Sequence, residues 1–376
     1  MRELAGPGVA VLPVVKADAY GHGAVPVARA LEAAGVEGLC VATWDEALEL
    51  RRGGVRATTL VLYPVPTAHV REAARRRIVL TAGDPAGLTA LLDACGTLKP
   101  GGRRLGVALE VETGLGRGGL LEGEVAEAAR AVSATRGVRL DSVWSHLAAA
   151  GDDDRSRAQV ARFASASDEV AGAGIRLGRR HLVGSGGLLG RSAPAFEAVR
   201  PGLAIYGLTP EDVAADVAAT DRAARLRPAM SLRARPVRVV DLPAGHGVSY
   251  GPRFETRRRS RIATLPLGYG DGWPRSLGGV AAALVRGHRV PLVGTVAMDA
   301  IMADVTGVPG EPVTCDDEFT LLGDDGDGRI DVAELAQLRT TISWEVVTAM
   351  ARRLSRVYHA AAGPIGVRTL VSGDDA

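Results

Sequence analysis

Short apolar runs alternate with amphipathic, Ala- and Arg-rich stretches along the chain as far as Asp221. The runs are bounded by Gly, Pro and polar residues, so they predict buried strands, and the amphipathic stretches predict helices. The predicted strands are Val11–Lys16, Gly38–Thr43, Thr58–Leu62, Ile78–Thr81, Leu105–Val111, Ser142–His146, His181–Gly184 and Val199–Ile205. The predicted helices between them include Ala24–Ala34, Trp44–Arg52, Glu122–Thr135 and Asp154–Ala173. This alternation favours an α/β fold, a (β/α)8 barrel of the TIM type, over an open sheet.

The pattern changes after Asp221, where the apolar runs are short, close together and bounded by turns. They predict strands within Ser231–Leu242, Arg261–Leu267, Val280–Val285, Val290–Val296, Ile301–Val305, Glu318–Leu322 and Thr369–Ser372. Helical stretches interrupt them near Asp331–Arg339 and Trp344–Leu354. We therefore expect a barrel domain over residues 1–222 and a mostly β domain over residues 223–376, joined by a linker at Pro210–Pro228.

Composition is that of a soluble globular protein, with 47% hydrophobic and 23% charged residues. A net charge of +2 gives no reason to expect a nucleic acid or a membrane as partner. The cysteines Cys40, Cys95 and Cys315 are scattered without metal-ligand spacing and suit a reducing compartment. Neither a secretion signal nor an apolar segment of membrane-spanning length is recognisable. We expect a cytoplasmic protein without a metal site.

Lysine is nearly absent, because Lys16 and Lys99 are the only lysines among 45 Lys and Arg residues. Lys99 lies in Thr-Leu-Lys-Pro-Gly-Gly, which is typical of an exposed loop. Lys16 ends an apolar run, where burial lowers the pKa of an amine and frees it to form a Schiff base. A strand-end lysine taken alone more often extends its amine into solvent. The neighbouring strand ends must therefore decide its role.

Further reactive side chains are predicted at the carboxyl ends of the barrel strands, which is where barrel enzymes carry their active sites. They are Arg117 after the fifth strand, His146 at the end of the sixth, Ser185 after the seventh and Arg200 in the eighth. The segments Val183–Gly187 and Arg200–Leu203 contain glycines, so their backbone N–H groups are accessible to a phosphate. A Schiff-base lysine facing a phosphate site is the layout that a pyridoxal phosphate enzyme needs.

Seven motifs resemble those of the alanine racemase family, whose cofactor is pyridoxal phosphate. The first, Val-Val-Lys-Ala-Asp-Ala-Tyr-Gly-His-Gly at residues 14–23, is similar to the motif of the cofactor lysine. The others, in order, lie at residues 111–117, 144–146, 199–207, 247–251, 268–272 and 296–299. The resemblance covers nearly the whole chain and implies a barrel followed by a β domain.

The resemblance also implies a homodimer with shared active sites and two bases on opposite faces of a small amino-acid substrate. Lys16 would hold the cofactor and serve the face of the D-isomer, and Tyr250 of the partner subunit would serve that of the L-isomer. The implied cofactor-binding residues are Lys16, Tyr20, His146, Ser185, Arg200, Gly202, Leu203 and Trp344. Arg117 and the main chain of Met298 would meet the substrate carboxylate.

Arg200 would face the pyridine nitrogen of the cofactor, by the same resemblance. Arginine stays protonated at any working pH, so the nitrogen would stay neutral and a carbanion would be poorly delocalised. A short-lived carbanion favours reprotonation over decarboxylation or transamination. We therefore expect interconversion of L- and D-alanine, which would supply D-alanine for peptidoglycan.

Three features depart from the family's pattern. Glu110 stands seven residues before Arg117, where the family usually has a carbamylated lysine, and supplies an anion without carbon dioxide. Trp344 stands where the family has a tyrosine, so we expect a narrower pocket and weaker retention of the cofactor. Only fifteen residues precede Lys16, where family members usually carry a further strand and helix.

Two further motifs favour structural roles. Gly114-x-Gly116-x-x-Gly119 has the spacing of a dinucleotide-binding loop, but the acidic residue Asp141 precedes its strand instead of ending it. The segment Asp325–Glu334 resembles a calcium loop whose first ligand position is Gly323. A turn followed by a helix with acidic residues at its start explains that segment more simply.

Other functions remain open on the same residues. A related racemase could act on serine or on an unusual amino acid of secondary metabolism. A lyase or aldolase could use the same cofactor and scaffold. A non-catalytic protein that only binds pyridoxal phosphate is less compatible with Tyr250, because it needs no second base.

Overall fold

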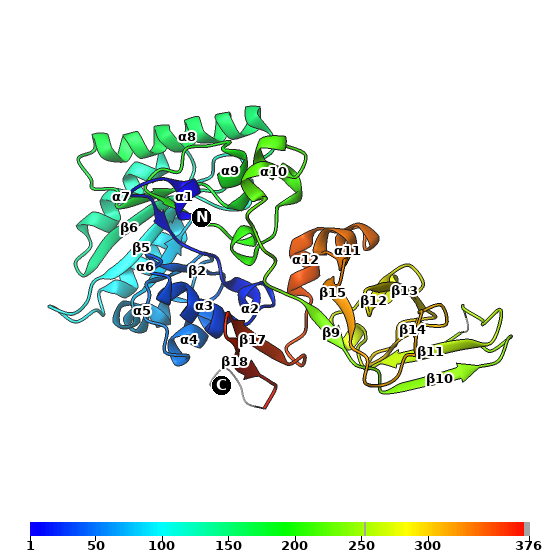
Figure 1. The fold of residues 1–376 in the computed structure, drawn as a ribbon. Helices are drawn as coiled ribbons and strands as arrows, with labels where there is room; N and C mark the ends of the chain where they lie inside the picture. The colour runs from blue at the N-terminus through cyan, green and yellow to red at the C-terminus, as the bar shows by residue number, and fades with distance from the viewer. Residues whose placement is uncertain (252, 372–376) are drawn as a thin grey trace. The chain divides into compact units, whose positions relative to one another are not determined.

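The computed structural model describes residues 1–251 and 253–371, and the chain forms two compact units, Met1–Leu226 and Arg227–Ala376. Eight parallel strands form the first unit, in the order β1-β8-β7-β6-β5-β4-β3-β2 (Figure 1). A parallel bridge between Val14 and Cys40 joins the segment after β1 to β2 and closes the ring. The strands are β1 (Ala10–Val11), β2 (Leu39–Val41), β3 (Thr59–Val61), β4 (Ile78–Ala82), β5 (Leu105–Glu110), β6 (Val138–Trp144), β7 (Arg179–His181) and β8 (Ala198–Val199). The predicted TIM-type barrel is confirmed.

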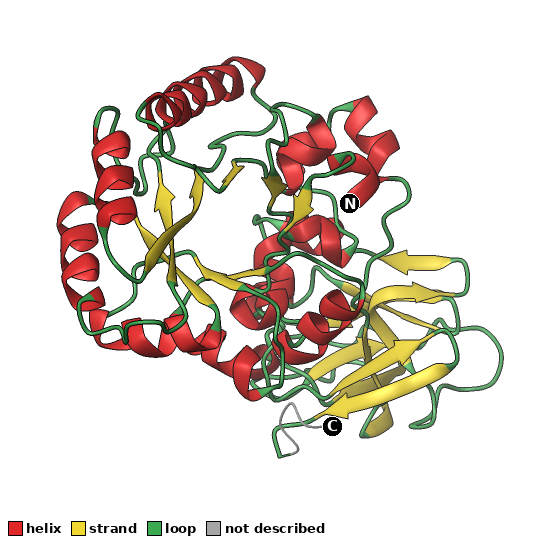
Figure 2. Ribbon diagram, turned by 90° about the vertical axis from the view of Figure 1, so that its left-hand side faces the viewer, coloured by secondary structure: helices red, strands yellow, loops and turns green. Residues whose placement is uncertain are grey.

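Helices surround these strands (Figure 2). They are α1 (Arg2–Ala5), α3 (Ala24–Ala33), α4 (Trp44–Arg52), α5 (Val70–Arg76), α6 (Pro85–Cys95), α7 (Glu124–Ala134), α8 (Asp153–Gly172), α9 (Ser185–Gly190) and α10 (Val217–Ala223), with the short turn α2 (Lys16–Tyr20) and the 3₁₀ helices η1 (Thr67–His69), η2 (Leu203–Tyr206) and η3 (Glu211–Val213). The four predicted helices form within a residue or two of their expected ends. Helix α4 begins at Trp44 because Thr43 and Glu46 form a capping box.

The second unit is mostly antiparallel β structure, as predicted. Its main sheet has the order β10-β11-β14-β13-β12-β15-β16, with β9 paired to β15, and β17 and β18 form a separate hairpin. Its strands are β9 (Leu232–Ala234), β10 (Arg238–Leu242), β11 (Ser260–Leu265), β12 (Ala282–Val285), β13 (His288–Val293), β14 (Ile301–Asp304), β15 (Phe319–Asp325), β16 (Gly328–Ile330), β17 (Arg356–Ala360) and β18 (Gly363–Arg368). Its helices are α11 (Val332–Leu338) and α12 (Ser343–Thr348), with the 3₁₀ helices η4 (Tyr269–Asp271) and η5 (Arg275–Leu277).

The predicted strands of the barrel were too long at the ends that carry the candidate residues. Lys16 lies in the turn α2, beyond the strand that it was predicted to end. His146 lies two residues past β6, and Arg200 directly follows β8. The predicted strand Val199–Ile205 was wrong beyond its start, because Pro201 lacks a backbone donor and a 3₁₀ helix begins at Leu203.

Two other predictions were wrong. The segment Pro210–Pro228 is not a plain linker, because it contains η3 and α10. Helix α10 buries Ala219 and Ala223, four residues apart, and small alanines give a weak apolar signal. The strand predicted at Thr369–Ser372 is absent over 369–371, and Ser372 lies outside the described residues. The hairpin β17–β18 precedes it instead.

Candidate active site

The turn α2 that follows the first strand is left-handed. Ala17, Asp18, Ala19 and Tyr20 have φ values of 51°, 56°, 52° and 52°. None of them is glycine, and each such residue costs about 1–2 kcal/mol relative to a right-handed conformation. Strain of this kind collects at functional sites, and it persists only where the surroundings hold it. Lys16 is the residue at the start of this strained turn.

Side chains fasten the turn from several directions. The Asp18 carboxylate accepts a hydrogen bond from the Ala24 N–H at 2.8 Å, at the start of α3. Nδ1 of His22 contacts the carbonyl oxygens of Ala19 and Tyr20 at 3.0 and 2.9 Å, so it carries a proton and donates it to them. These contacts are local. They therefore explain how the sequence Asp-Ala-Tyr-Gly-His supports its own unusual backbone.

Lys16 is partly buried at the carboxyl end of the barrel strands. Burial lowers the pKa of its amine below the ordinary value, and the positive charge of Arg117 lowers it further. The charge of Glu46 acts in the opposite direction. A lowered pKa leaves a larger fraction of the amine uncharged at neutral pH, which is the form that attacks a carbonyl or accepts a proton.

Arg200 is the central buried cation, with only 3% of its surface exposed. Its Nη1 donates to the His181 carbonyl at 2.8 Å and contacts Nδ1 of His181, and its Nη2 donates to the Ser145 carbonyl. Its guanidinium lies over the Trp144 ring, 4.9 Å from the ring centroid. Among the described residues it forms no ion pair with a carboxylate. The charge is thus stabilised by carbonyl oxygens, a ring nitrogen of His181 and the π face of Trp144, with Glu110 acting on it without an ion pair.

The histidines beside Arg200 are neutral. Burial, reinforced by Arg200, lowers the pKa of His146 to about 3 and that of His181 well below its ordinary value. Nη2 of Arg200 lies 3.4 Å from Nδ1 of His146, at the long limit of a hydrogen bond. Since arginine can only donate, Nδ1 of His181 is an acceptor and its ring proton sits on Nε2. The cluster therefore contains no group that readily gives up a proton, and its one charge is that of the Arg200 guanidinium.

Three residues of the predicted phosphate site meet at the loops after β7 and β8. The Ser185 hydroxyl accepts hydrogen bonds from the N–H groups of Gly202 and Ala204, at 2.9 and 3.1 Å. The Tyr20 hydroxyl packs so closely over Gly202 that a Cβ atom there would lie 2.5 Å from the hydroxyl oxygen. Leu203, the other predicted backbone contact, follows Gly202 and begins η2. Hydroxyl and backbone N–H donors thus gather where the resemblance places a phosphate.

Arg117 lies on the loop after β5, and Glu110 ends that strand. The Arg117 guanidinium is 3.9 Å from the Glu110 carboxylate, a spacing that places a negative charge behind the arginine. Burial raises the pKa of Glu110, while Arg117 and Arg200 lower it. The structure thus places a carboxylate beside Arg117, and its equivalence to the carbamylated lysine of the family stays a prediction.

Gln159 of α8 is a buried residue that no sequence pattern singled out. Its Nε2 donates to the Thr113 hydroxyl at 3.0 Å and the His146 carbonyl at 2.9 Å, and its Oε1 accepts from the Ala148 N–H. The Thr113 hydroxyl in turn lies 2.7 Å from that of Ser145. This network joins the loop of Arg117 to that of His146. Its residues are 46 and 13 positions from Gln159 in the chain, so no local pattern announces it.

The second unit carries the remaining predicted residues. Tyr250 and Met298 are 70% and 53% exposed. Among the described residues, none accepts a hydrogen bond from the Met298 N–H. Trp344 is partly buried at the start of α12. The structure of the second unit thus leaves the Tyr250 and Met298 side chains open to solvent.

Arg353 braces the loops on which Met298 lies. It donates to both oxygens of Asp271, at 2.5 and 2.9 Å, and to the Asp299 carboxylate. The Gly270 N–H donates to the Met298 carbonyl at 2.9 Å. A Cβ at Gly268 would lie 2.4 Å from that same carbonyl, so the motif Gly-Tyr-Gly-Asp-Gly is required for the close approach of the two loops.

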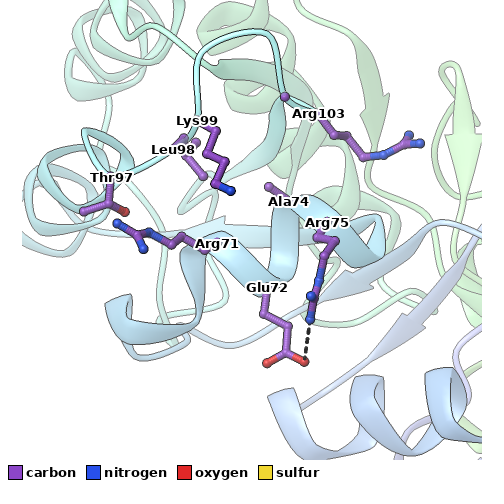
Figure 3. Close-up of a pocket in the computed structure, with 9 residues that line it drawn as sticks. Arg71, Glu72, Ala74, Arg75, Thr97, Leu98, Lys99 and Arg103 are labelled. Carbon is purple, nitrogen blue, oxygen red and sulfur yellow. Dashed lines mark ion pairs between the residues drawn. The ribbon is translucent and has the colours of Figure 1, made fainter.

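Lys99, the second lysine of the chain, has surroundings unlike those of Lys16. It lines a hollow of about 550 Å³ on the first unit, between α5 and the loop after α6 (Figure 3). Arg71 and Arg75 of α5 line the same hollow, and Arg75 is paired with Glu72 at 3.9 Å. Lys99 itself is exposed. The two lysines of the chain thus differ in burial, and only Lys16 lies at the strand ends.

Neither a metal site nor a membrane-spanning helix is found in the described part of the chain. No three His, Cys, Asp or Glu side chains there are grouped to hold a metal ion. Within the same residues, every helix is too short or too polar to cross a bilayer.

Comparisons with known proteins agree across both units. The family model "Alanine racemase, N-terminal domain" matches residues 1–210, and "Alanine racemase, C-terminal domain" matches residues 229–358. The alanine racemase of Symbiobacterium thermophilum is 41% identical over 358 residues, which are 93% of this chain and 90% of the relative. That of Sorangium cellulosum is 38% identical over 353 residues, 92% of this chain and 90% of the relative.

Solved structures show the same likeness. Alanine racemase from Streptomyces coelicolor A3(2) superposes with a TM-score of 0.83 at 35% identity, covering 95% of this chain and 93% of that one. The enzyme from Bacillus anthracis, with bound L-Ala-P, gives 0.87 at 30% identity, covering 98% and 93%. Fold, strand-end residues and relatives together define an amino-acid racemase. The chain belongs to the alanine racemase family.

Because Glu110 carries a carboxyl group of its own and needs no carbon dioxide to become an anion, we expect the activity to be independent of bicarbonate. Glu110→Lys should instead become dependent on added bicarbonate, since a lysine there is neutralised and made anionic only by carbon dioxide. Initial rates in degassed buffer with and without bicarbonate measure this. A clear rise of the wild-type rate on adding bicarbonate would contradict the role given to Glu110.

Gly202→Ala should weaken retention of added pyridoxal phosphate about tenfold, since an overpacked Cβ costs about 1–3 kcal/mol and would displace the Tyr20 hydroxyl. Equilibrium dialysis with absorbance detection measures retention. Gly172→Ala is the matched control, because a Cβ at the end of α8 meets nothing within 4 Å. Equal retention by both variants would show that the close approach at Gly202 is not part of the cofactor site.

Proposed function

We propose that the chain is a pyridoxal phosphate-dependent racemase that interconverts L- and D-alanine in the cytoplasm and supplies D-alanine for peptidoglycan. The observation that carries the proposal is the gathering of Lys16, Arg200 and the hydroxyl-lined loops of Ser185 and Tyr20 at one end of the barrel. The relatives that match nearly the whole chain are named alanine racemases, which supports alanine as the substrate.

The residues fit pyridoxal phosphate by their donor chemistry. Phosphate requires several donors in a small space, and the Tyr20 and Ser185 hydroxyls and the Leu203 N–H would supply them. The Gly202 N–H donates to the Ser185 oxygen, so it would hold that hydroxyl in place for the phosphate. Arg200, which has no carboxylate partner among the described residues, would donate to the pyridine nitrogen. His146 would hold Arg200 in place. Trp344, which belongs to the second unit, would contact the cofactor by the family resemblance.

Pyridoxal phosphate, when bound, draws electron density from the substrate and makes its α C–H acidic. Lys16 would take or return the α-proton on one face, because its lowered pKa leaves more of the amine in the uncharged form that accepts a proton. Arg200 would keep its own protons throughout, since a guanidinium does not give them up. Arg117, positioned by Glu110, would bind the substrate carboxylate together with the Met298 N–H of a second copy of the chain.

Tyr250 of the partner subunit would be the base on the opposite face. A racemase must accept a proton on one side of the α-carbon and deliver one on the other, so a single lysine is not sufficient. The exposure of Tyr250 and Met298 supports their use by a second copy of the chain. We therefore propose a homodimer whose β domain completes the site of its partner.

Chiral chromatography of a panel of L-amino acids, incubated with the protein and pyridoxal phosphate, tests the reaction. We expect L-alanine to approach an equal mixture of isomers and to gain deuterium at the α-carbon in D₂O. Faster racemisation of serine would change the substrate but not the reaction class. Accumulation of pyruvate, an aldehyde or an amine without racemisation would overturn the proposal in favour of a lyase or aldolase.

Mixing two inactive variants tests the shared site. Lys16→Ala and Tyr250→Phe should each lose about 100-fold or more of the activity, as expected for removal of an acid–base group. Exchanged 1:1 as dimers, they should regain about a quarter of the wild-type activity, because half the dimers are mixed and each then has one complete site. If the mixture stays inactive while mass spectrometry shows mixed dimers, the two bases of one site do not come from different subunits, and the shared-site proposal is wrong.

A further inference from the structure

Glu46 makes three backbone hydrogen bonds next to Lys16. Its Oε1 accepts from the Ala17 N–H at 2.7 Å, and its Oε2 accepts from the N–H groups of Ala42 and Thr43 at 2.7 and 3.1 Å. Ala17 is the first left-handed residue of the turn α2, and the other two residues follow β2. One carboxylate thus ties the strained turn to the neighbouring strand end.

The Glu46 side chain is itself held rigidly. It stands in the first turn of α4, where the Thr43 hydroxyl accepts a hydrogen bond from the Glu46 N–H at 3.3 Å. A carboxylate is favoured there by the unpaired N–H groups at a helix start. The side chain therefore serves two elements at once, since it caps α4 and extends to the Ala17 N–H of α2.

Glu46 is also the acidic residue that acts most strongly on the Lys16 amine. Arg117 opposes it from the loop after β5, and Cys40 of β2 contributes less. Burial raises the pKa of Cys40 to about 12, so this thiol is uncharged at working pH. His146, which also lies within electrostatic reach of Lys16, is neutral. The other charged residues of α2, α3 and α4 are Asp18, Arg29, Glu32, Asp45, Glu49, Arg51 and Arg52.

We infer that Glu46 is the positioning residue for Lys16: its carboxylate fastens the left-handed turn through Ala17, and its negative charge opposes the positive charge of Arg117 at the Lys16 amine. Two functions of the side chain are thereby separable. Hydrogen bonding fixes where the Lys16 backbone lies, and the charge fixes how readily its amine is protonated. The inference rests on the proposed role of Lys16 for its meaning in catalysis, but not for its test.

The scarcity of lysine makes the test sharp. The full chain is trace-labelled with acetic anhydride over a pH series before any cofactor is added, and the Lys16 and Lys99 peptides are separated by mass spectrometry. Lys16 and Lys99 are the only lysines, and Lys99 is exposed, so it serves as the internal reference. Only the uncharged amine reacts, and the midpoint of labelling therefore reports the protonation of each lysine.

Two variants separate the functions of Glu46. Glu46→Gln keeps one oxygen that can accept from the Ala17 N–H, but its NH2 group cannot accept from the Ala42 and Thr43 N–H groups, and the charge is lost. With the turn still fastened at Ala17, the Lys16 midpoint should fall by about 0.5–1 pH unit. Glu46→Ala removes the hydrogen bonds as well, so the turn can relax and Lys16 becomes solvated. Its midpoint should then rise toward that of Lys99, and retention of added pyridoxal phosphate should fall several-fold.

Glu32→Gln is the matched control. Glu32 of α3 also accepts two backbone hydrogen bonds in the barrel, from the N–H groups of Arg56 and Ala57 at 2.9 and 2.6 Å. Its loss should leave the Lys16 midpoint unchanged, whatever it does to the melting temperature. A change as large as that of Glu46→Gln would attribute the effect to general loosening and overturn the inference.

The inference is also overturned if Glu46→Gln leaves the Lys16 midpoint at its wild-type value, or raises it as Glu46→Ala does. Borohydride trapping of the wild-type protein with pyridoxal phosphate is a separate measurement. A cofactor attached elsewhere than Lys16 would contradict the proposed function, while the labelling result would still decide the role of Glu46.

Discussion

The left-handed turn behind Lys16 is the constraint on which the rest of the site depends. Four successive non-glycine residues hold positive φ values, a conformation that an isolated peptide would abandon. Glu46, Asp18 and His22 each contribute hydrogen bonds to it or to its ends. The result is a short, stiff connection that delivers Lys16 and Tyr20 to neighbouring positions at the barrel mouth.

The charges around this turn have a consistent arrangement. Arg200 is fully buried among carbonyl oxygens and neutral histidines, whereas the two nearby carboxylates serve the flanks. Glu46 fastens the backbone next to Lys16, and Glu110 lies behind Arg117. Among the described residues no carboxylate forms an ion pair with Arg200, so in the proposed function the guanidinium alone would meet the ring nitrogen of the cofactor. That division of charge suits a reaction limited to moving one proton out and one proton in.

Much of this organisation was predictable from the sequence. Apolar runs of strand length identified the barrel, and the amphipathic pattern of residues 44–52 predicted helix α4 to the residue. The structure adds the reason for its start, which is the capping box of Thr43 and Glu46. The turn at Ala17–Tyr20 was not predictable by conformation, since no glycine marks it and its support comes from Glu46, 29 residues away. Gln159 escaped notice for the same reason: its partners are distant in sequence, and an isolated glutamine in an amphipathic helix suggests only a solvated face.

Alanine at positions 17 and 19 has a consequence for protein engineering. Glycine would adopt these backbone angles without steric cost, and at such positions it is the more comfortable residue in the native state. It would also widen the range of conformations open to the segment. The chain therefore retains backbone strain at these two residues, and the turn is stiffer as a result. Glycine substitutions made there to raise thermal stability would leave the Lys16 amine less precisely positioned.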